Sequence, residues 1–237
     1  MEDYRENKVS LYEDNIGGVA LIQHMGDDLT IVNAARASLD KVSKKMGERE
    51  KKLSNFLIQS GHTSTTEHNV ITFWVKVPLF VARQHMRHRT FSYNEISRRY
   101  TSANLEFYIP NQMRQQDTKN RQASLDETFN PEILNGLDAV SSIKYHVKNS
   151  IQLYEQMIEK GVAREQARMV LPQNIYTTYW ATGSLHNWVN SFIAKRDHED
   201  AQWEIKLLAR EISRMIQQVW PLAHANFVKY GKIPPLF

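Results

Sequence analysis

The sequence has no cysteine among its 237 residues. Disulfide bonds, thiolate metal sites and iron–sulfur clusters are therefore excluded, together with catalysis by a cysteine nucleophile. The chain also lacks an apolar run long enough to cross a bilayer. Its N-terminus, MEDYRENKVSLYEDN, is polar and acidic, unlike a signal peptide. We therefore expect a cytoplasmic protein that has no membrane partner.

A strong overall charge is missing as well. The net charge is +4, and 24% charged residues beside 41% hydrophobic residues is ordinary for a globular protein. Electrostatic function must therefore come from local clusters rather than from the field of the whole protein. No G-x-G-x-x-G turn follows a strand and no P-loop is present, so side chains would have to bind any phosphate groups.

Hydrophobic periodicity predicts a mixture of strands and helices. Apolar and β-branched runs predict strands at 18–24, 69–77, 107–110 and 174–182. Helical spacing predicts helices at 28–40 (with Asp28 as N-cap), 48–59, 79–89, from Asn130-Pro131 to Gly161, 163–170, 184–196 and 201–220. Residues 111–130 are almost wholly polar and predict a surface excursion. Because no regular βαβ rhythm is present, we expect an α+β fold. It would be a single domain over residues 1–237, with a mixed or antiparallel sheet flanked by helices, including long helices in the C-terminal half.

The stretch RHRTFSYNEISRRY, residues 87–100, concentrates positive charge. It carries four arginines and one carboxylate, Glu95, and Arg83 lies just upstream. Arginine forks beside serine hydroxyls suit a phosphate, and a carboxylate among them suits a sugar hydroxyl or an amide N–H. The simpler alternative is a solvated basic end of a helix, where cations are favoured. Hydrogen-bonding side chains such as Ser92 and Asn94 favour a ligand site instead.

The full pattern RHRxxSxNExSxRY in this stretch resembles the motif of the flavin-dependent thymidylate synthases. Three further segments resemble segments of the same family and stand in the family's order. They are GHTSTTEH at 61–68, GVAREQARMVLP at 161–172 and AKRDHEDAQWEI at 194–205. Together these segments carry the resemblance across most of the chain, from about residue 18 to about residue 230.

The resemblance implies an enzyme that reductively methylates dUMP to dTMP. Methylenetetrahydrofolate would supply the carbon, and NADPH would supply the electrons through FAD. The enzyme would be a homotetramer with shared active sites. The unrelated classical thymidylate synthases attack the pyrimidine with a cysteine thiolate, which this chain cannot do. The protein would instead position and polarise its ligands around a flavin.

The same resemblance assigns roles to individual residues. Those implied for dUMP are Gln84, Arg87, Glu95, Ile96, Ser97, Arg98, Arg99, Arg168 and Arg196. Those implied for FAD are His62, Ser64, Arg87, His88, Arg89, Glu95, Ser184, His186 and Asn190. The catalytic residue would be Arg196, beside the pyrimidine ring at N3. An arginine is permanently protonated, so it would stabilise negative charge on the ring rather than act as a base.

Three departures from the family's pattern are visible. Thr65 and Thr66 stand where Pro-Phe is common, and Asp200 stands where a histidine is usual. One extra residue lies between Gly183 and Arg196. We expect no metal site, because His62, Glu67 and His68 have neither cysteine partners nor an HExxH spacing.

Two other classes of protein remain alternatives at this stage. A nucleic-acid-binding module would use the arginines for phosphates and Phe91, Tyr93 and Tyr100 for stacking on bases, although the weak overall charge argues against it and we expect no nucleic-acid partner. A flavin electron-transfer protein would bind FAD without methyl transfer. Arg196 itself could merely pair with Glu199 or Asp200 on a solvated helix turn, where such pairs contribute little.

Overall fold

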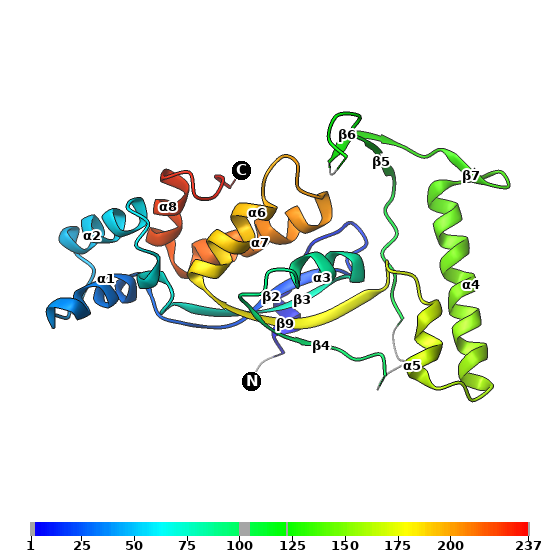
Figure 1. The fold of residues 1–237 in the computed structure, drawn as a ribbon, viewed down its shortest axis with the longest axis horizontal. Helices are drawn as coiled ribbons and strands as arrows, with labels where there is room; N and C mark the ends of the chain where they lie inside the picture. Colours follow the sequence, from blue (N-terminus) through cyan, green and yellow to red (C-terminus); the bar gives the residue numbers. More distant parts are fainter. Residues whose placement is uncertain (1–2, 100–104, 122, 237) are drawn as a thin grey trace.

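The computed structural model describes residues 3–99, 105–121 and 123–236 (Figure 1). Its centre is a five-stranded antiparallel sheet with the strand order β1-β2-β3-β9-β4. The strands are β1 (Val9–Ser10), β2 (Gly18–Met25), β3 (Val70–Pro78), β9 (Tyr176–Ser184) and β4 (Ser92–Glu95). Two small antiparallel pairs lie outside this sheet: β5 (Met113–Gln116) with β6 (Ser124–Phe129), and β7 (Glu132–Leu134) with β8 (Leu137–Asp138).

Helices occupy much of the rest of the described chain. They are α1 (Asp28–Arg36), α2 (Glu48–Gln59), α3 (Leu79–His85), α4 (Ala139–Glu159), α5 (Arg164–Ala167), α6 (Ala194–Arg196), α7 (Trp203–Val219) and α8 (Pro221–Lys229). A π-helical turn, Asn187–Ile193, leads into α6, and short 3-10 turns lie at Tyr4–Asn7, Ala37–Leu39, Thr63–Thr66 and Arg168–Val170. The expected α+β class with an antiparallel sheet is confirmed. Among the described residues, no helix is both long and apolar enough to cross a membrane.

The core lies between one face of the sheet and a layer made of α3, α7 and the π-helical turn that leads into α6 (Figure 1). Ile71, Phe73 and Val75 on β3 alternate onto this face and are fully buried. They meet the apolar stripe of α7, including Leu208 and Ile212. Burying a large apolar side chain contributes on the order of 2 kcal/mol, so this layer fixes where α3 and α6 sit.

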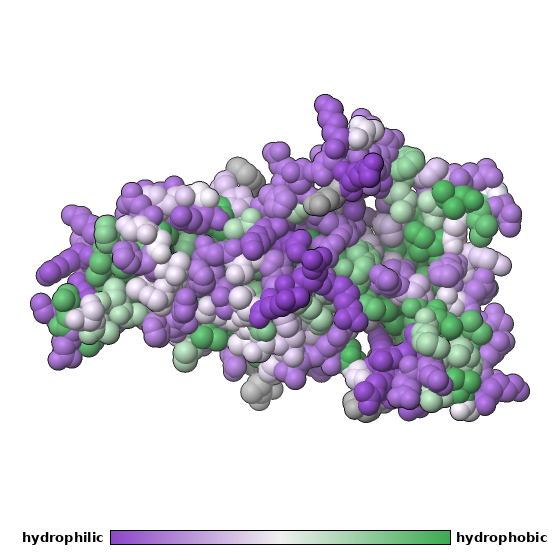
Figure 2. Space-filling model, in the orientation of Figure 1, coloured by the Kyte–Doolittle hydropathy of each residue, from purple (hydrophilic) through white to green (hydrophobic). Residues whose placement is uncertain are grey.

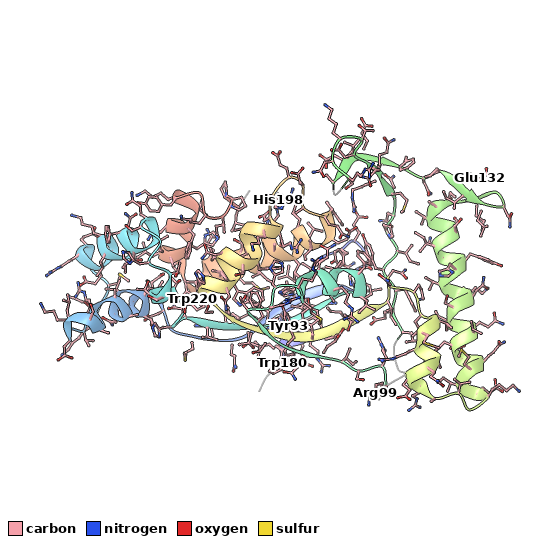
Figure 3. All side chains as sticks on the ribbon, viewed as in Figure 1. Tyr93, Arg99, Glu132, Trp180, His198 and Trp220 are labelled. Carbon is pink, nitrogen blue, oxygen red and sulfur yellow. The ribbon has the colours of Figure 1, made fainter. Side chains whose placement is uncertain are left out.

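The other face of the sheet has a lighter cover. The ring of Tyr4, from the N-terminal turn, lies 6.3 Å from Trp74 and 5.7 Å from Trp180. Trp180 is still 38% exposed, and Figure 3 shows it on the side of the sheet away from α7.

Several predicted boundaries are wrong. The helix expected over 79–89 ends at His85, and the long helix begins at Ala139 rather than at Asn130-Pro131. The Asp138 side chain accepts the Ser141 N–H at 2.7 Å and caps α4, after a hairpin that residues 130–138 form instead of a helix. Of the strand expected at 107–110, only a bridge from Phe107 to Ile175 forms.

Two helix ends also differ from the prediction. Asp27, not Asp28, caps α1, because the Asp27 side chain accepts the Thr30 N–H at 2.8 Å. Asp28 instead accepts the N–H groups of Leu222 and Ala223 at the start of α8. The helix expected over 201–220 stops at 219, and α8 follows from Pro221, although the sequence pattern did not predict it.

The elements α4, α5, β7 and β8 form the end of the molecule opposite α1 and α2 (Figure 1). The hairpin β5–β6 lies within the predicted polar excursion and is largely exposed. Figure 2 shows hydrophobic residues gathered on this end. On α4 the large side chains of Tyr145 and Leu153 are about half exposed, at 52% and 46%.

Candidate active site

The chain turns directly after α3, and the residues of this turn differ in their burial. His85 and His88 are buried, whereas Arg87 and Arg89 are exposed. The hydroxyl of Tyr93, on β4, lies 2.9 Å from the His85 carbonyl oxygen and 3.1 Å from that of His88. It therefore satisfies carbonyls that a longer helix would have paired. Arg87 and His88, which fall within the helix predicted over 79–89, lie beyond its observed end, and only His88 is buried.

His88 contacts the residue predicted to be catalytic. The Nε of Arg196, at the end of α6, donates to Nε2 of His88 at 2.9 Å. Burial, and then the positive charge of Arg196, lower the pKa of His88 to about 4, so the ring is neutral near pH 7. Among the described residues, no carboxylate forms an ion pair with Arg196. The simple alternative, a pair with Glu199 or Asp200, is therefore wrong for this structure.

A cavity of about 340 Å³ lies beside β4 and β9, and we call it the arginine cavity. Four residues predicted to contact the nucleotide line it: Glu95, Ile96, Arg98 and Arg168. Its other lining residues are Leu79, Arg83, Glu165, Met169, Leu171, Ile175, Tyr176 and Thr177. Chain segments 70 residues apart thus meet because β4 pairs with β9 while the segment 164–171 precedes β9.

Hydrogen bonds to β9 fix the groups that line this cavity. Thr177 donates its hydroxyl to Oε1 of Glu95 at 2.6 Å, and Arg98 donates from Nη2 to the Tyr176 carbonyl at 3.2 Å. Burial lowers the pKa of Arg98 from its ordinary value, but a guanidinium remains protonated at any physiological pH. Cationic forks and a fixed carboxylate in one cavity suit an anion that also carries hydroxyl or N–H donors.

Residues 97–99 continue from β4 toward α5. The Ser97 hydroxyl oxygen accepts the N–H of Arg99 at 3.3 Å. Figure 3 shows Arg99 near α5, well beyond Tyr93 along the same segment. Tyr100, the last residue of the motif, lies outside the described residues.

The remaining predicted nucleotide residues lie elsewhere in the chain. The lining residues of the arginine cavity, all within the described part, do not include Gln84, Arg87 or Arg196. Gln84 instead donates its amide N–H to Gln202, whose own amide donates to Glu204 at 2.9 Å. The arginine cavity of one chain is therefore lined by only part of the predicted nucleotide set.

Four of the residues predicted to bind the flavin lie at or near the π-helical turn. His62 and Asn190 line a second cavity of about 70 Å³, together with residues of α2 and α8. The Nδ1 of His186 lies 3.0 Å from the Asn190 amide nitrogen. The Ser184 hydroxyl accepts the N–H of Asn187 at 3.3 Å and so helps to start the turn.

The other predicted flavin residue of this region is Ser64, which is exposed in the turn Thr63–Thr66. Thr65 and Thr66, which replace the usual Pro-Phe, are buried and donate their hydroxyls to the carbonyls of His62 and Thr63. Within the described residues, no three His, Asp or Glu side chains are grouped as metal ligands.

Sequence reasoning missed several residues that shape the site. Thr177 donates a hydrogen bond to Glu95, and Glu165 lines the arginine cavity together with the arginines. Glu204 is 4% exposed and accepts from Arg114 at 2.7 Å. The sequence did carry a sign of this buried pair. Glu204 is the only carboxylate in the apolar first turns of α7, and a carboxylate that is buried there needs a charged or hydrogen-bonding partner.

Comparison with known proteins shows the family. The sequence model described as "Thymidylate synthase complementing protein" matches residues 20–222. A flavin-dependent thymidylate synthase from Thermus thermophilus is 43% identical over 90% of this chain and 76% of its own length. One from Thermosipho africanus is 38% identical over 91% of this chain and 92% of its own length.

A solved structure agrees with these sequence matches. The UMP/dUMP methylase PolB from Streptomyces cacaoi, bound with 5-Br dUMP, superposes with a TM-score of 0.78 at 28% identity. The match covers 96% of this chain and 100% of that one. Fold and sequence together define a nucleotide-methylating class of flavoprotein. The chain belongs to the flavin-dependent thymidylate synthase family.

Proposed function

We propose that this protein reductively methylates dUMP to dTMP, with methylenetetrahydrofolate as carbon donor, NADPH as reductant and FAD as cofactor. The observation that carries the proposal is the arginine cavity, in which Arg98 and Arg168 lie with Glu95. Such a set suits a nucleotide monophosphate, because guanidinium groups bind phosphate while a carboxylate accepts from sugar or base. Relatives named flavin-dependent thymidylate synthases and a methylase bound to a dUMP analogue support it.

In this proposal the chain's own residues bind the nucleotide and polarise its pyrimidine ring. Ser97, Arg98, Arg99 and Arg168 bind the phosphate, and Glu95, held by Thr177, accepts from the nucleotide. Arg196 stabilises negative charge on the pyrimidine as its C5 carbon becomes nucleophilic. Without cysteine, no thioether to the enzyme activates the ring.

The residues present fit an FAD molecule in their chemistry. Arg87 and Arg89 are exposed cations that suit a diphosphate, and His62, His186 and Asn190 offer hydrogen bonds to a ring system. The flavin would supply hydride transfer. The cavity at His62 is far smaller than the roughly 300 Å³ at which ligand pockets usually begin. A flavin would therefore need surface from a second copy of the chain.

The incomplete set of predicted nucleotide residues in the arginine cavity also favours shared sites. We propose a homotetramer in which the arginine cavity of one copy faces the Arg196 region of another. The exposed apolar side chains of α4, Tyr145 and Leu153, supply part of the surface that such contacts need. Light scattering tests this, and a monomer that stays fully active at nanomolar dilution would refute it.

The decisive experiment is synthesis of dTMP from dUMP by the purified protein, followed by chromatography, with each of methylenetetrahydrofolate, NADPH and FAD omitted in turn. We expect a yellow protein whose product formation needs all three. A colourless protein that gains no flavin spectrum on titration with FAD would favour a nucleic-acid-binding module. Bound flavin whose spectrum does not respond to dUMP would favour an electron-transfer protein.

A further inference from the structure

The contact between His88 and Arg196 allows only one arrangement of protons. Nε of Arg196 and Nε2 of His88 are 2.9 Å apart. A guanidinium has donors and no acceptor, so Nε2 of His88 must be the unprotonated nitrogen. A neutral imidazole carries its single proton on the other nitrogen. The structure therefore holds His88 as the Nδ1–H tautomer.

The surroundings of His88 favour its neutral form. The side chain is 8% exposed, and its ring centroid lies 5.4 Å from that of Phe192 and 6.4 Å from that of buried His85. The charges that act on it, those of Arg196, Lys195 and Arg87, are all positive. A second positive charge on His88 would repel Arg196, and both burial and these neighbours prevent it.

The π-helical turn packs against the same ring through Phe192. Hydrogen bonding changes here from five-residue spacing, Ala194 to Val189, to four-residue spacing, Asp197 to Ile193. The Ala194 N–H is shared between the carbonyls of Val189 and Phe192, so the change of spacing falls at the end of the turn. The Ser191 backbone, which belongs to this turn, raises the pKa of His88 and so opposes in part the larger lowering by burial and by Arg196. Single π-helical turns are frequent at functional sites.

We propose that His88 is a positioning residue, which orients the guanidinium of Arg196 without neutralising it. The inference rests on the proposed function, in which Arg196 stabilises charge on the pyrimidine. A carboxylate partner would orient Arg196 equally well, but its charge would cancel the field that the substrate needs. The neighbouring acid, Asp197, is instead paired with Arg210 at 2.9 Å. The terminal nitrogens of Arg196 thus keep both their donors and their charge for the substrate.

Kinetics of matched variants test this role. His88→Leu removes the acceptor, while His88→Gln keeps an acceptor oxygen at a similar reach. We expect the kcat of dTMP formation to fall about 10- to 100-fold in His88→Leu, the scale of a misplaced catalytic group, and to recover partly in His88→Gln. Flavin content should stay unchanged, although the resemblance assigns His88 to the flavin, because the His88 ring is buried against Arg196 and Phe192. In an Arg196→Ala background, His88→Leu should change kcat less than about twofold, because His88 acts through Arg196. Equal losses in both backgrounds, or loss of flavin instead of kcat, overturn the proposal.

A spectroscopic measurement separates this inference from the proposed function, because it needs no substrate. In protein labelled with ¹⁵N-histidine, with His88→Gln to assign the signal, Nδ1 should be protonated and Nε2 unprotonated, without titration down to about pH 5. Arg196→Met removes the nearest positive charge and should raise the pKa of His88 by about one unit. A protonated Nε2 near pH 7 refutes the orientation of Arg196 by His88. The expected spectrum in a protein that forms no dTMP refutes the proposed function alone.

Discussion

Glu204 is the buried carboxylate on which three parts of the molecule converge. Its Oε1 accepts from Nη2 of Arg114 at 2.7 Å and from the Tyr108 hydroxyl at 3.4 Å, and its Oε2 accepts from the Gln202 amide at 2.9 Å. Arg114 belongs to β5, so this pair ties the hairpin to α7. Gln202 in turn accepts from Gln84. Because a carboxylate only accepts, it fixes the direction of both amides and turns the Gln84 carbonyl oxygen away from Gln202.

Glu204→Gln keeps the shape of the side chain but places an N–H₂ group against one of the present donors, Arg114 or the Gln202 amide. Breaking a buried ion pair costs about 3–5 kcal/mol, and the 22% exposure of the Arg114 side chain reduces this to about 2–4 kcal/mol. For a chain of this size each kcal/mol lowers Tm by about 2–4 °C, so we expect a decrease of about 5–15 °C. If the Gln202 amide flips, Gln84 follows, and KM for the nucleotide should rise as well.

Calorimetry at one protein concentration measures the change in Tm, because Tm of an oligomer depends on concentration. The matched control is Glu48→Gln, the same chemical change at an 80% exposed side chain that pairs with Lys51 at 2.8 Å. It should have no measurable effect on Tm. Equal Tm values for the two variants would refute the argument. So would a Glu204→Gln, Arg114→Met double variant whose loss equals the sum of the single losses, since coupled partners are not additive.

Two further predictions concern the proposed active site. Arg196→Ala should lower dTMP turnover about 100-fold or more while flavin content, measured by absorbance, stays normal, and Arg196→Lys should recover activity only in part because a point charge lacks the planar fork. Thr177→Val removes the hydroxyl that donates to Glu95 at 2.6 Å and should raise KM for dUMP about 5- to 10-fold, the scale of the net contribution of one ordinary hydrogen bond. Thr178→Val, at the neighbouring position of β9, is its control, and equal KM values for the two variants would contradict the role of Thr177.

The elements that the sequence predicts best are those whose signal is local. The predicted helix 48–59 has the observed bounds of α2, and the strand predicted at 69–77 is β3 shifted by one residue. Both have strong periodicity and clear ends. Strand β4 was not predicted, because SYNE is polar and its strand form depends on pairing with β9, about 85 residues later. The end of α3 likewise depends on Tyr93, which lies outside the helical pattern. Its hydroxyl binds the carbonyl oxygens of His85 and His88.

The candidate site shows the same division between local and long-range information. The motif residues Glu95, Ile96 and Arg98 meet Arg168 in one cavity, as a shared nucleotide site requires. Their supports come from elsewhere in the fold: Thr177 for Glu95 and His88 for Arg196. The one-residue excess before Arg196 was visible in the sequence, and a turn with five-residue spacing accommodates such an excess. The sequence could not show that this turn would bring the Ser191 backbone to His88.

Buried histidines predict how the stability of the protein depends on pH. Burial is the main cause that lowers the pKa of His85, His88 and His224 in the folded protein, and the pKa of His88 falls from 6.5 to about 4. Between these two values the unfolded chain binds more protons than the folded one, so stability rises with pH. The contribution is fully present above about pH 6.5 and is lost as the pH falls toward 4, with at most about 3 kcal/mol from His88. Between pH 6.5 and 5 we expect a loss of about 1.5 kcal/mol from this residue. Urea unfolding of the wild type and of His88→Gln across that range measures it: the variant should lose less stability than the wild type, and parallel losses would show that His88 is not held neutral by the fold.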